Sequence, residues 1–349
     1  MVYLPIFIKG TMFKYISKRL SLLVPTLFGV ITMVFIMIAL SPGDPARVML
    51  GERATKESIE KLRVDLGLDK PLHIQYGRYL KRIVKLDLGR SIKTGQKVAS
   101  EIKDHFPATF ELTIFAMIFS TVLGVFIGIV SATKKDSWID LGSMVGALVG
   151  VSMPVFWLAL VLIIIFSIVL DIFPTGGRMD IRLYFTSITG FYVLDGFLIF
   201  LKTGSPKIFL SALHHMVLPA VALGTIPLAI IARITRSSML EVLNQDYIKT
   251  ARSAGINERK IIFQYALKNA LLPIITIIGL QFGILLSGAI LTETIFAWPG
   301  IGKWLYHAIE ARDYPAVQGG IIVISTAFVL INLIVDILYC LVNPKIRLS

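Results

Sequence analysis

The sequence predicts an all-α membrane protein whose chain crosses the bilayer six times. Of its 349 residues, 55% are hydrophobic and only 16% are charged, and the mean hydropathy is +0.77. Soluble domains carry about 25% charged residues. The apolar residues also gather into six blocks, and a helix needs about 20 such residues to cross a bilayer. Because lipid offers the backbone no hydrogen bonds, each block must be helical.

The blocks differ in length and in their prolines. The third block is the longest, so we expect it to be tilted or to extend beyond the bilayer. Prolines at 154, 219, 227 and 273 lie within or beside spans, where neighbouring helices can satisfy the carbonyl groups that they free. The expected spans cover residues 20–40, 110–132, 141–170, 213–232, 271–292 and 317–342.

The first block resembles a secretory signal because Lys14, Lys18 and Arg19 precede it. However, it is 21 residues long and no small-residue cleavage site follows it. We therefore expect an uncleaved first span. Met12 would also make a plausible start, which would leave residues 1–11 as an extension.

Lysine and arginine counts predict that both termini lie in the cytoplasm. With that orientation the inner segments carry 15 of these cations and the short outer segments carry six. The remaining 14 fall in residues 41–109, but long loops translocate largely regardless of charge. The expected parts are a cytoplasmic N-terminus (1–19), the first span (20–40), an extracytoplasmic domain (41–109), a core of five spans (110–342) with a cytoplasmic loop (233–270), and a cytoplasmic tail (343–349).

Two outer segments carry further patterns. In the first, residues 55–66 have helical spacing, with Thr55 as the expected N-cap and Gly67 as the expected C-cap. This pattern favours a small folded domain over a flexible tether. The second outer segment, 171–212, contains an apolar run interrupted by Asp195 and Gly196. That run is too short to span, so we expect an interfacial or re-entrant piece.

Composition and motifs exclude several function classes. A net charge of +13 suggests nucleic acid as a partner of a soluble protein, but here cations flank the spans and set orientation. The single cysteine, Cys340, allows no disulfide, and no Cys/His cluster predicts zinc; the adjacent pair His214–His215 could ligate a metal, although an interfacial role is favoured. The chain has no phosphate-binding loop and no catalytic constellation. We expect no catalytic residue, no metal and no cofactor of its own.

The loop 233–270 contains the most informative pattern. Residues 237–253 are rich in good helix formers and lead to Gly255, which suits a C′ position with positive φ. Asn257 then suits the N-cap of a following helix. The expected structure is two short helices that meet at a glycine corner and present Ala251, Ser253 and Ala254 beside cations. A solvated loop, whose cations serve only topology, is the alternative.

The stretch "DYIKTARSAGINERKIIFQYALKNALLPII" resembles the cytoplasmic coupling loop of ABC-importer permeases, in particular the oligopeptide/dipeptide/nickel branch. Ala251, Gly255 and the pair Leu272–Pro273 match the general pattern. Lys249 replaces the usual glutamate and the glycine-to-proline spacing is long, as in the peptide branch. Three further stretches also match, in order and spacing, from about residue 12 to 346: "SPGDPAR" (41–47), "VSMPVFWLAL" (151–160) and "TETIFAWPGIGKWLYHAIEARDYPAVQG" (292–319). The insertion "ITGFYVLDGFL" favours the dipeptide/oligopeptide side.

This resemblance implies a type I ABC-importer permease in a prokaryotic inner membrane. The implied partners are a second homologous permease, two cytoplasmic ATPase subunits that bind ATP and magnesium, and an extracytoplasmic peptide-binding protein. The segment that would couple to an ATPase comprises Lys249, Thr250, Ala251, Arg252, Ser253, Ala254, Gly255 and Ile256.

The translocation path is less clearly marked. Ionisable residues inside spans are functional candidates. Asp171, Arg233 and Glu293 lie at span edges, where an interfacial role is favoured, whereas Asp336 lies inside the last block and has a hydrogen bond to a neighbouring helix as its alternative. Met153, Phe156 and Trp157 follow or flank Pro154 and could line a cavity or form a packing stripe.

Three function classes remain at this stage. The first is a peptide-import permease, which the motifs favour. The second is a permease for nickel or another small solute, and the third is a stand-alone channel or membrane enzyme. The missing catalytic constellation argues against the third class.

The charge distribution yields a topology test. In a variant with Cys340 replaced by serine, we expect Lys61→Cys to react with an impermeant thiol reagent added from outside. We expect Lys135→Cys to react only after the membrane is permeabilised, because inner loops carry the cationic excess. The reverse labelling pattern would contradict this orientation.

Overall fold

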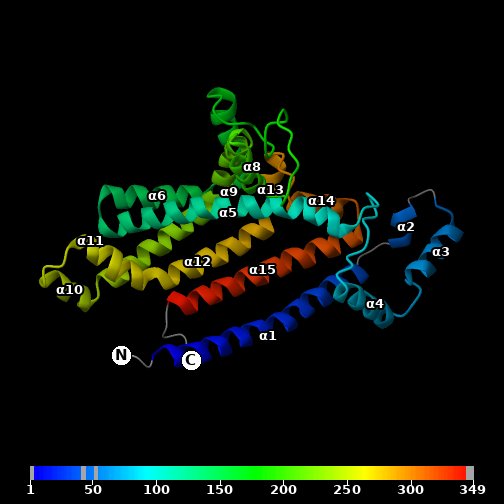
Figure 1. Cartoon of the computed structure of the whole chain (residues 1–349), viewed down its shortest axis with the longest axis horizontal. Coiled ribbons are helices and arrows are strands. Elements are labelled where there is room, and N and C mark those ends of the chain that lie inside the picture. Colours follow the sequence, from blue (N-terminus) through cyan, green and yellow to red (C-terminus); the bar gives the residue numbers. More distant parts are fainter. Residues whose placement is uncertain (1–3, 41–44, 51–53, 343–349) are drawn as a thin grey trace.

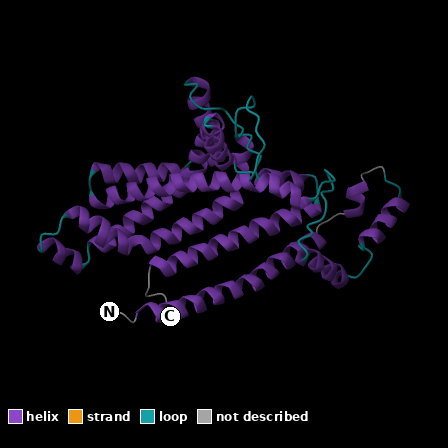
Figure 2. Cartoon of the chain, in the orientation of Figure 1, coloured by secondary structure: helices purple, strands orange, loops and turns teal. Residues whose placement is uncertain are grey.

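The computed structural model describes residues 4–40, 45–50 and 54–342, which form helices joined by loops (Figures 1 and 2). Within these residues the only β-type pairing is an isolated bridge between Arg90 and Lys97, which closes a turn. The predicted tail 343–349 and the first four residues of the 41–47 motif lie outside the described residues. The predicted all-α class is confirmed.

Among the residues that the structure describes, five helical stretches are long and apolar enough to cross a membrane, and a bent pair of helices brings the number to six if the pair is one span. The long helices lie side by side in layers, with α1 at one edge and α6 at the other (Figure 1). They are α1 (Leu4–Ala39), α5 (Val98–Thr133), α9 (Lys207–Leu243), α12 (Leu267–Gly288, preceded by α11, Glu258–Lys260, and the π-helical η2, Ile261–Ala266) and α15 (Tyr314–Val342); the bent pair joins α6 (Trp138–Ser152) to α7 (Val155–Leu162) and the π-helical η1 (Ile163–Val169).

The third apolar block is broken, whereas we predicted a tilted or extended helix. Its two parts meet at an angle of 104°. Met153 has an extended conformation with ψ 129°, and Pro154 begins the next helix as its N-cap. Proline lacks an N–H donor and disfavours the helical conformation of the residue before it. The proline therefore ends one helix and starts another at this position.

Two spans are longer than the hydropathy predicted. Helix α5 begins at Val98 instead of near 110, and α9 covers Lys207–Leu243 instead of 213–232. Their additional turns carry charged and polar residues, which do not prevent helix formation outside the hydrocarbon core. Hydropathy locates the part of a helix that crosses the bilayer, not its ends.

The described residues between the first two spans form three helices near the C-terminal end of α1 (Figure 1). They are α2 (Pro45–Leu50), α3 (Lys56–Leu66) and α4 (Leu72–Val84). The predicted caps of α3 are confirmed. The Thr55 hydroxyl accepts a hydrogen bond from the Ser58 N–H at 3.2 Å, and Gly67 is left-handed with φ 70°.

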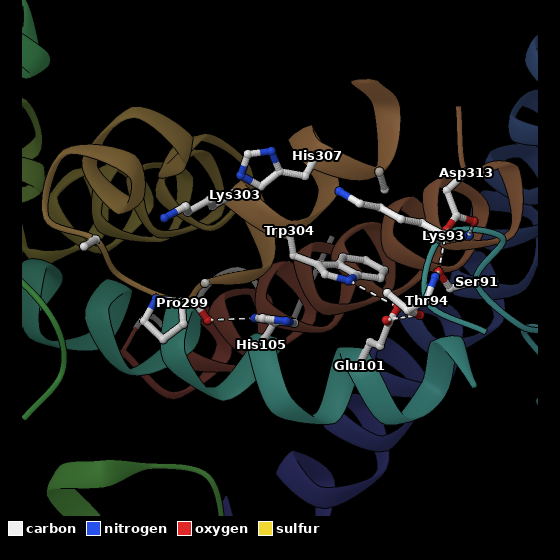
Figure 3. Close-up of a pocket in the computed structure, with 14 residues that line it drawn as sticks. Ser91, Lys93, Thr94, Glu101, His105, Pro299, Lys303, Trp304, His307 and Asp313 are labelled. Carbon is white, nitrogen blue, oxygen red and sulfur yellow. Dashed lines mark hydrogen bonds between the residues drawn. The ribbon is translucent and has the colours of Figure 1, made fainter. Parts of the chain in front are cut away.

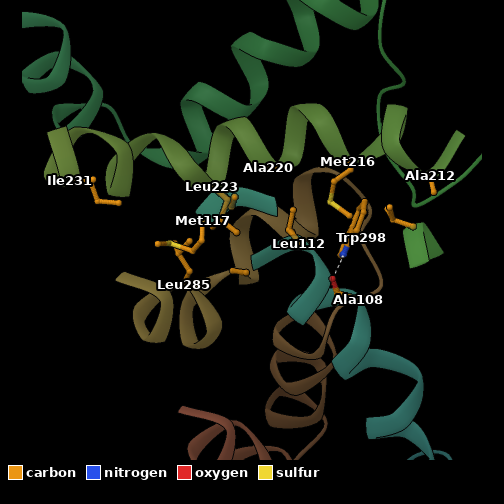
Figure 4. Packing of buried hydrophobic residues seen from close by; sticks show 13 residues of the cluster. Ala108, Leu112, Met117, Ala212, Met216, Ala220, Leu223, Ile231, Leu285 and Trp298 are labelled. Atoms are coloured by element: carbon orange, nitrogen blue, oxygen red, sulfur yellow. Dashed lines mark hydrogen bonds between the residues drawn. The ribbon is translucent and has the colours of Figure 1, made fainter. Parts of the chain in front are cut away.

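The core of the bundle surrounds the N-terminal half of α5. Trp298 is almost fully buried, and its indole Nε1 donates to the Ala108 carbonyl at 2.9 Å. Figure 4 shows this side chain between α5 and α9, near Leu112 and Met216. The short helix α13 (Ile290–Ile295) precedes this tryptophan, and α14 (Ile301–Glu310) follows it. The segment between the last two spans is thus anchored in the core.

A buried ion pair fixes the segment 171–212, which is called the insertion from here on, to α5. The Arg178 guanidinium donates to Glu111 of α5 at 2.7 Å, and both side chains are nearly inaccessible. The same guanidinium also lies 3.8 Å from the centre of the Tyr192 ring. Glu111 additionally accepts the Val193 N–H at 2.7 Å, so one carboxylate fixes both the loop and the start of helix α8 (Tyr192–Thr203).

Asp195 organises the loop that precedes α8. Burial raises the pKa of this carboxyl, but hydrogen bonds from Thr189, Ser187 and the Ile188 N–H outweigh burial and hold the pKa below its usual value. The carboxylate therefore stays charged and keeps these donors in place. The insertion thus has a fixed internal structure.

Removing one partner of the Arg178–Glu111 pair should loosen this insertion. A buried charge that loses its partner typically costs about 3–5 kcal/mol. We therefore expect Arg178→Met to speed hydrogen exchange of residues 178–196 by about a hundredfold, measured by mass spectrometry on the purified complex. Arg182→Met, at an exposed position in the same loop, is the control and should leave exchange unchanged. Equal exchange in both variants would contradict the prediction.

Candidate functional site

The candidate site is a short helix between the spans α9 and α12. Helix α10 covers Asp246–Ser253 and lies beyond the ends of the long helices together with α11 (Figure 1). Gln245 precedes it in an extended conformation with ψ 149°. The chain leaves α10 at Gly255 and re-enters helix after Asn257, whose side chain accepts the Arg259 N–H at 2.9 Å.

The predicted glycine corner is confirmed. Gly255 has φ 76°, in the left-handed region that favours glycine. Its N–H donates to the Arg252 carbonyl at 2.9 Å, and the Ile256 N–H donates to the Ala251 carbonyl at 3.2 Å. These two bonds form a Schellman motif, which satisfies carbonyl groups at the end of a helix. The predicted N-cap role of Asn257 is also confirmed.

The prediction of one helix over residues 237–253 was wrong. Helix α9 continues to Leu243, and Asn244 and Gln245 separate it from α10. Asparagine is a weak helix former. The break turns the chain, so α10 is a separate element and not an extension of the span.

One face of α10 is buried against the bundle. Ile248 is fully buried and Ala251 is 6% exposed. Both belong to an apolar cluster that also contains Met239 of α9, Ile261 of η2 and Ala270 of α12. Because this cluster joins α10 to the ends of both flanking spans, α10 cannot move without them.

Ala251 therefore lies on the inner face, and the expectation that the corner presents it outward was wrong. The helix repeat places positions 248 and 251 on one face, toward the core. The outward face contains Lys249, Thr250, Arg252, Ser253, Ala254 and Gly255, which are all exposed, and Ile256 is partly buried.

Two ion pairs stabilise the outward face. Arg252 donates to Glu258 at 2.6 Å and so connects α10 to α11 across the corner. Lys249 lies 2.8 Å from Asp246 within α10. Both pairs are exposed, so each contributes little stability on its own. They orient the cations while leaving Ser253 and Ala254 as a small, uncharged surface at the tip.

A buried polar contact supports the ends of the spans behind this helix. Arg236 of α9 donates to both carboxylate oxygens of Asp140, at 2.6 and 2.7 Å. Ser131 of α5 also donates to Asp140 at the start of α6. Bidentate arginine–carboxylate pairs are geometrically specific. Three spans are thereby tied together close to α10.

Three of the four predicted path residues lie together, and the fourth, Asp336, lies elsewhere. Met153, Phe156 and Trp157 line an apolar hollow of about 550 Å³ at the bend between α6 and α7. The rings of Phe156 and Trp157 are nearly half exposed. The hollow adjoins a proline-broken helix whose outer surface is apolar, which suits contact with another membrane subunit or with lipid.

Asp336 does not join that hollow. Its carboxylate lies 3.1 Å from the Arg19 guanidinium, so it ties α15 to α1. Glu293, for which we favoured an interfacial role, is fully buried. It accepts from the Thr109 hydroxyl and from the Lys303 N–H at 2.7 Å, and so caps the start of α14. Sequence position alone gave no signal for this capping role.

A second hollow, of about 370 Å³, lies between α5, α14 and the turn 91–97 (Figure 3). Its two carboxylates already have donors. Glu101 accepts from the Thr94 hydroxyl at 2.6 Å and from the Trp304 indole at 3.3 Å. Asp313 accepts from Ser91 at 2.5 Å. The described residues contain no group of three or more metal-ligating side chains. The carboxylates around this hollow connect the turn 91–97 to α5, to α14 and to the start of α15.

Comparison with known proteins gives a consistent result along the chain. Residues 124–348 match the family described as binding-protein-dependent transport system inner membrane components. Residues 12–113 match the family of their N-terminal membrane components. Together the two matches cover nearly the whole chain, including α10 and the helices α2 to α4.

Several curated proteins are similar over nearly the whole chain. A di/tripeptide transport system permease protein of Pseudomonas aeruginosa is 49% identical over 96% of this chain and 99% of its own. A dipeptide transport system permease protein of Alkalihalophilus pseudofirmus is 50% identical over 96% and 100%. A dipeptide transport system permease protein of Escherichia coli K12 is 45% identical over 96% and 99%.

The geometry of Gly255 predicts a graded effect of substitution. A Cβ atom at this position would meet no atom within 4 Å, so only the positive φ penalises a side chain. We expect Gly255→Val to destabilise the corner by about 1 kcal/mol or more, and Gly255→Asn by less. Hydrogen exchange of residues 246–256 should be about five- to tenfold faster in the valine variant.

Ser253→Val is the matched control, because Ser253 is exposed but has ordinary helical geometry. It should leave the exchange of α10 near normal. Equal exchange in the valine and asparagine variants at 255 would show that the left-handed conformation is not what holds the corner.

Proposed function

The chain belongs to the family of binding-protein-dependent transport system inner membrane components, and from this membership we propose that it forms half of a translocation path for di- and oligopeptides. Membership makes it a multi-pass membrane permease of an ABC importer, and therefore a transport subunit and not an enzyme. Such permeases work in general with a second permease, ATPase subunits and a binding protein. The identity over nearly the whole chain to proteins named for dipeptide transport carries the proposal.

A peptide substrate suits the composition of the spans. Two charged residues of the long helices pair within the chain, Asp336 with Arg19 and Arg236 with Asp140. A path with few fixed charges fits a substrate whose backbone is constant and whose side chains vary. Nickel or another small solute remains the alternative substrate. A path for nickel would need metal-coordinating side chains at fixed positions.

The outward face of α10 is the proposed contact with a cytoplasmic ATPase. Lys249, Thr250, Arg252, Ser253 and Ala254 would lie in a groove of that partner, while Ile248 and Ala251 anchor the helix to the spans. ATP and magnesium would bind to the partner and not to this chain. Closure of the two ATPases would then move α10 and the flanking spans together, which requires a rigid element.

Orientation follows from the same assignment. If α10 contacts a cytoplasmic ATPase, both termini lie in the cytoplasm and helices α2 to α4 lie outside. A binding protein would deliver peptide to that outer side. The positive excess of the predicted inner segments supports this orientation.

Transport by the reconstituted complex tests the proposal. This chain, its partner permease, both ATPases and the binding protein would be placed in proteoliposomes, and ATP-dependent uptake of a radiolabelled dipeptide would be compared with uptake of nickel. We expect dipeptide uptake that requires the binding protein. Uptake of nickel without dipeptide uptake would favour the alternative substrate.

Cysteine crosslinking tests the contact surface. In a background with Cys340 replaced by serine, Ser253→Cys and Ala254→Cys should crosslink to cysteines in the ATPase groove, because both positions are exposed. Ala251→Cys is the matched control, because Ala251 lies only two residues before Ser253 but its side chain is buried. It should crosslink at least about tenfold less than the cysteine at 253. Equal crosslinking from the buried position would contradict the assigned face.

A further inference from the structure

Helix α4 combines three features that the transport function does not use. It carries three cations and no acid, with a fourth cation, Lys85, directly after it, it packs on the C-terminal end of α1, and apolar side chains remain exposed beside these cations. We propose that α4 lies in the headgroup layer of the bilayer and binds anionic phospholipid through its cations. The inference requires only that α1 spans the membrane.

The first argument is depth. Phe35 of α1 contacts Tyr76 and Tyr79 of α4, with ring centres 5.1 and 5.5 Å apart. The hydroxyl groups of Thr32 and Tyr76 are 2.6 Å apart. The apolar span of α1 ends at Ala39. At about 1.5 Å per residue, Phe35 and Thr32 lie about 6 and 10 Å inside that end.

This depth matches that of known interfacial helices. Amphipathic helices of this kind bury their apolar face about 5–10 Å into the boundary between headgroups and acyl chains. A helix that packs on α1 at this level cannot stand clear of the membrane. The rest of its surface must face lipid headgroups or another protein.

The second argument is the position of the cations. Arg78, Lys81, Arg82 and Lys85 follow the spacing i, i+3, i+4 and i+7, so they form one stripe. The side chains that are least exposed, Tyr76, Tyr79, Leu80 and Ile83, lie on the opposite side. With α1 against that side, the cationic stripe points away from the bundle at headgroup level.

Three of these four cations also lack an ion-pair partner, whereas the fourth, Arg78, lies close enough to Asp69 to act on its carboxylate. Lys81, Arg82 and Lys85 form no ion pair with any residue in the described part of the chain. Lipid phosphates supply the missing charge, and a basic stripe of this kind gains affinity with each additional cation.

The third argument is the apolar anchor. Val84 and Leu86 are 83% and 84% exposed, although they lie within five residues of three of the cations. Exposed aliphatic side chains next to lysine and arginine are typical of helices that lie in a bilayer surface. If α4 faced water, both apolar side chains would be exposed to it, which is unfavourable.

Depth-dependent quenching tests the location. The full transporter, with Cys340→Ser and Val84→Cys carrying a fluorescent label, would be placed in nanodiscs. We expect brominated lipid to quench this label and aqueous iodide not to. Val64→Cys on α3, which is also exposed, is the matched control and should show the reverse. A Val84 label that responds only to iodide would overturn the proposal.

Lipid retention tests the chemistry. Nanodiscs would contain phosphatidylcholine with or without phosphatidylglycerol, and lipid that remains bound after detergent extraction would be counted by native mass spectrometry. We expect the variant K81Q/K85Q to retain phosphatidylglycerol about tenfold less well, and the control variant K56Q/K61Q on α3 to behave like the parent. Equal loss in both variants would overturn the specific site. So would a Val84 label that becomes protected only when the binding protein or another subunit is added, because α4 would then be a protein-docking surface.

Discussion

The close approach of α5 and α9 is the contact on which the bundle depends. At the crossing, a Cβ atom on Gly128 would lie 2.7 Å from the Ala232 carbonyl oxygen, and one on Gly124 would lie 2.9 Å from that of Leu228. The Ser120 hydroxyl donates to the Gly224 carbonyl at 2.6 Å. Lipid provides no hydrophobic force between helices, so such backbone contact through small residues is what holds spans together. The helices α6, α8 and α12 pack on this pair.

Charged contacts lock the two ends of that pair. At one end Asp140 joins α5, α6 and α9, and at the other Glu111 joins α5 to the insertion through Arg178. Burying a single unpaired charge would be costly, and each of these carboxylates is met by several donors. The apolar middle of the bundle can therefore stay free of fixed charge, while its ends are held in a defined geometry.

The sequence predicted the features that depend on local chemistry. Thr55, Gly67, Gly255 and Asn257 occupy their predicted cap positions, because capping follows from a few neighbouring backbone groups. The all-α class followed from hydropathy. Helix ends and bends were harder to predict. Both halves of the third block are strongly apolar, so hydropathy did not reveal the 104° bend at Pro154.

The sequence also did not predict which side chains of α10 face the bundle and which face outward. Ala251 and Ser253 are both small and lie two residues apart, yet one faces the bundle and the other faces outward. The distinction depends on Ile261 and Ala270, which approach α10 only after the chain has turned at Gly255. Likewise, Glu293 was recognisable as an ionisable residue near a span, but its role as the cap of α14 depends on the return of the chain past Trp298.

The packing of α10 explains how a small helix can act on a large bundle. Ile248 and Ala251 lie in one apolar cluster with residues of α9, η2 and α12, so a force on α10 is applied to two spans at once. The Arg236–Asp140 contact then carries displacement of α9 to α5 and α6. Packed interiors deform little and tend to switch between discrete arrangements. On the proposed coupling role, a displacement of α10 would therefore reach the opposite end of these spans, where Glu111 and Trp298 hold the segment 171–212 and the residues before α14 against α5.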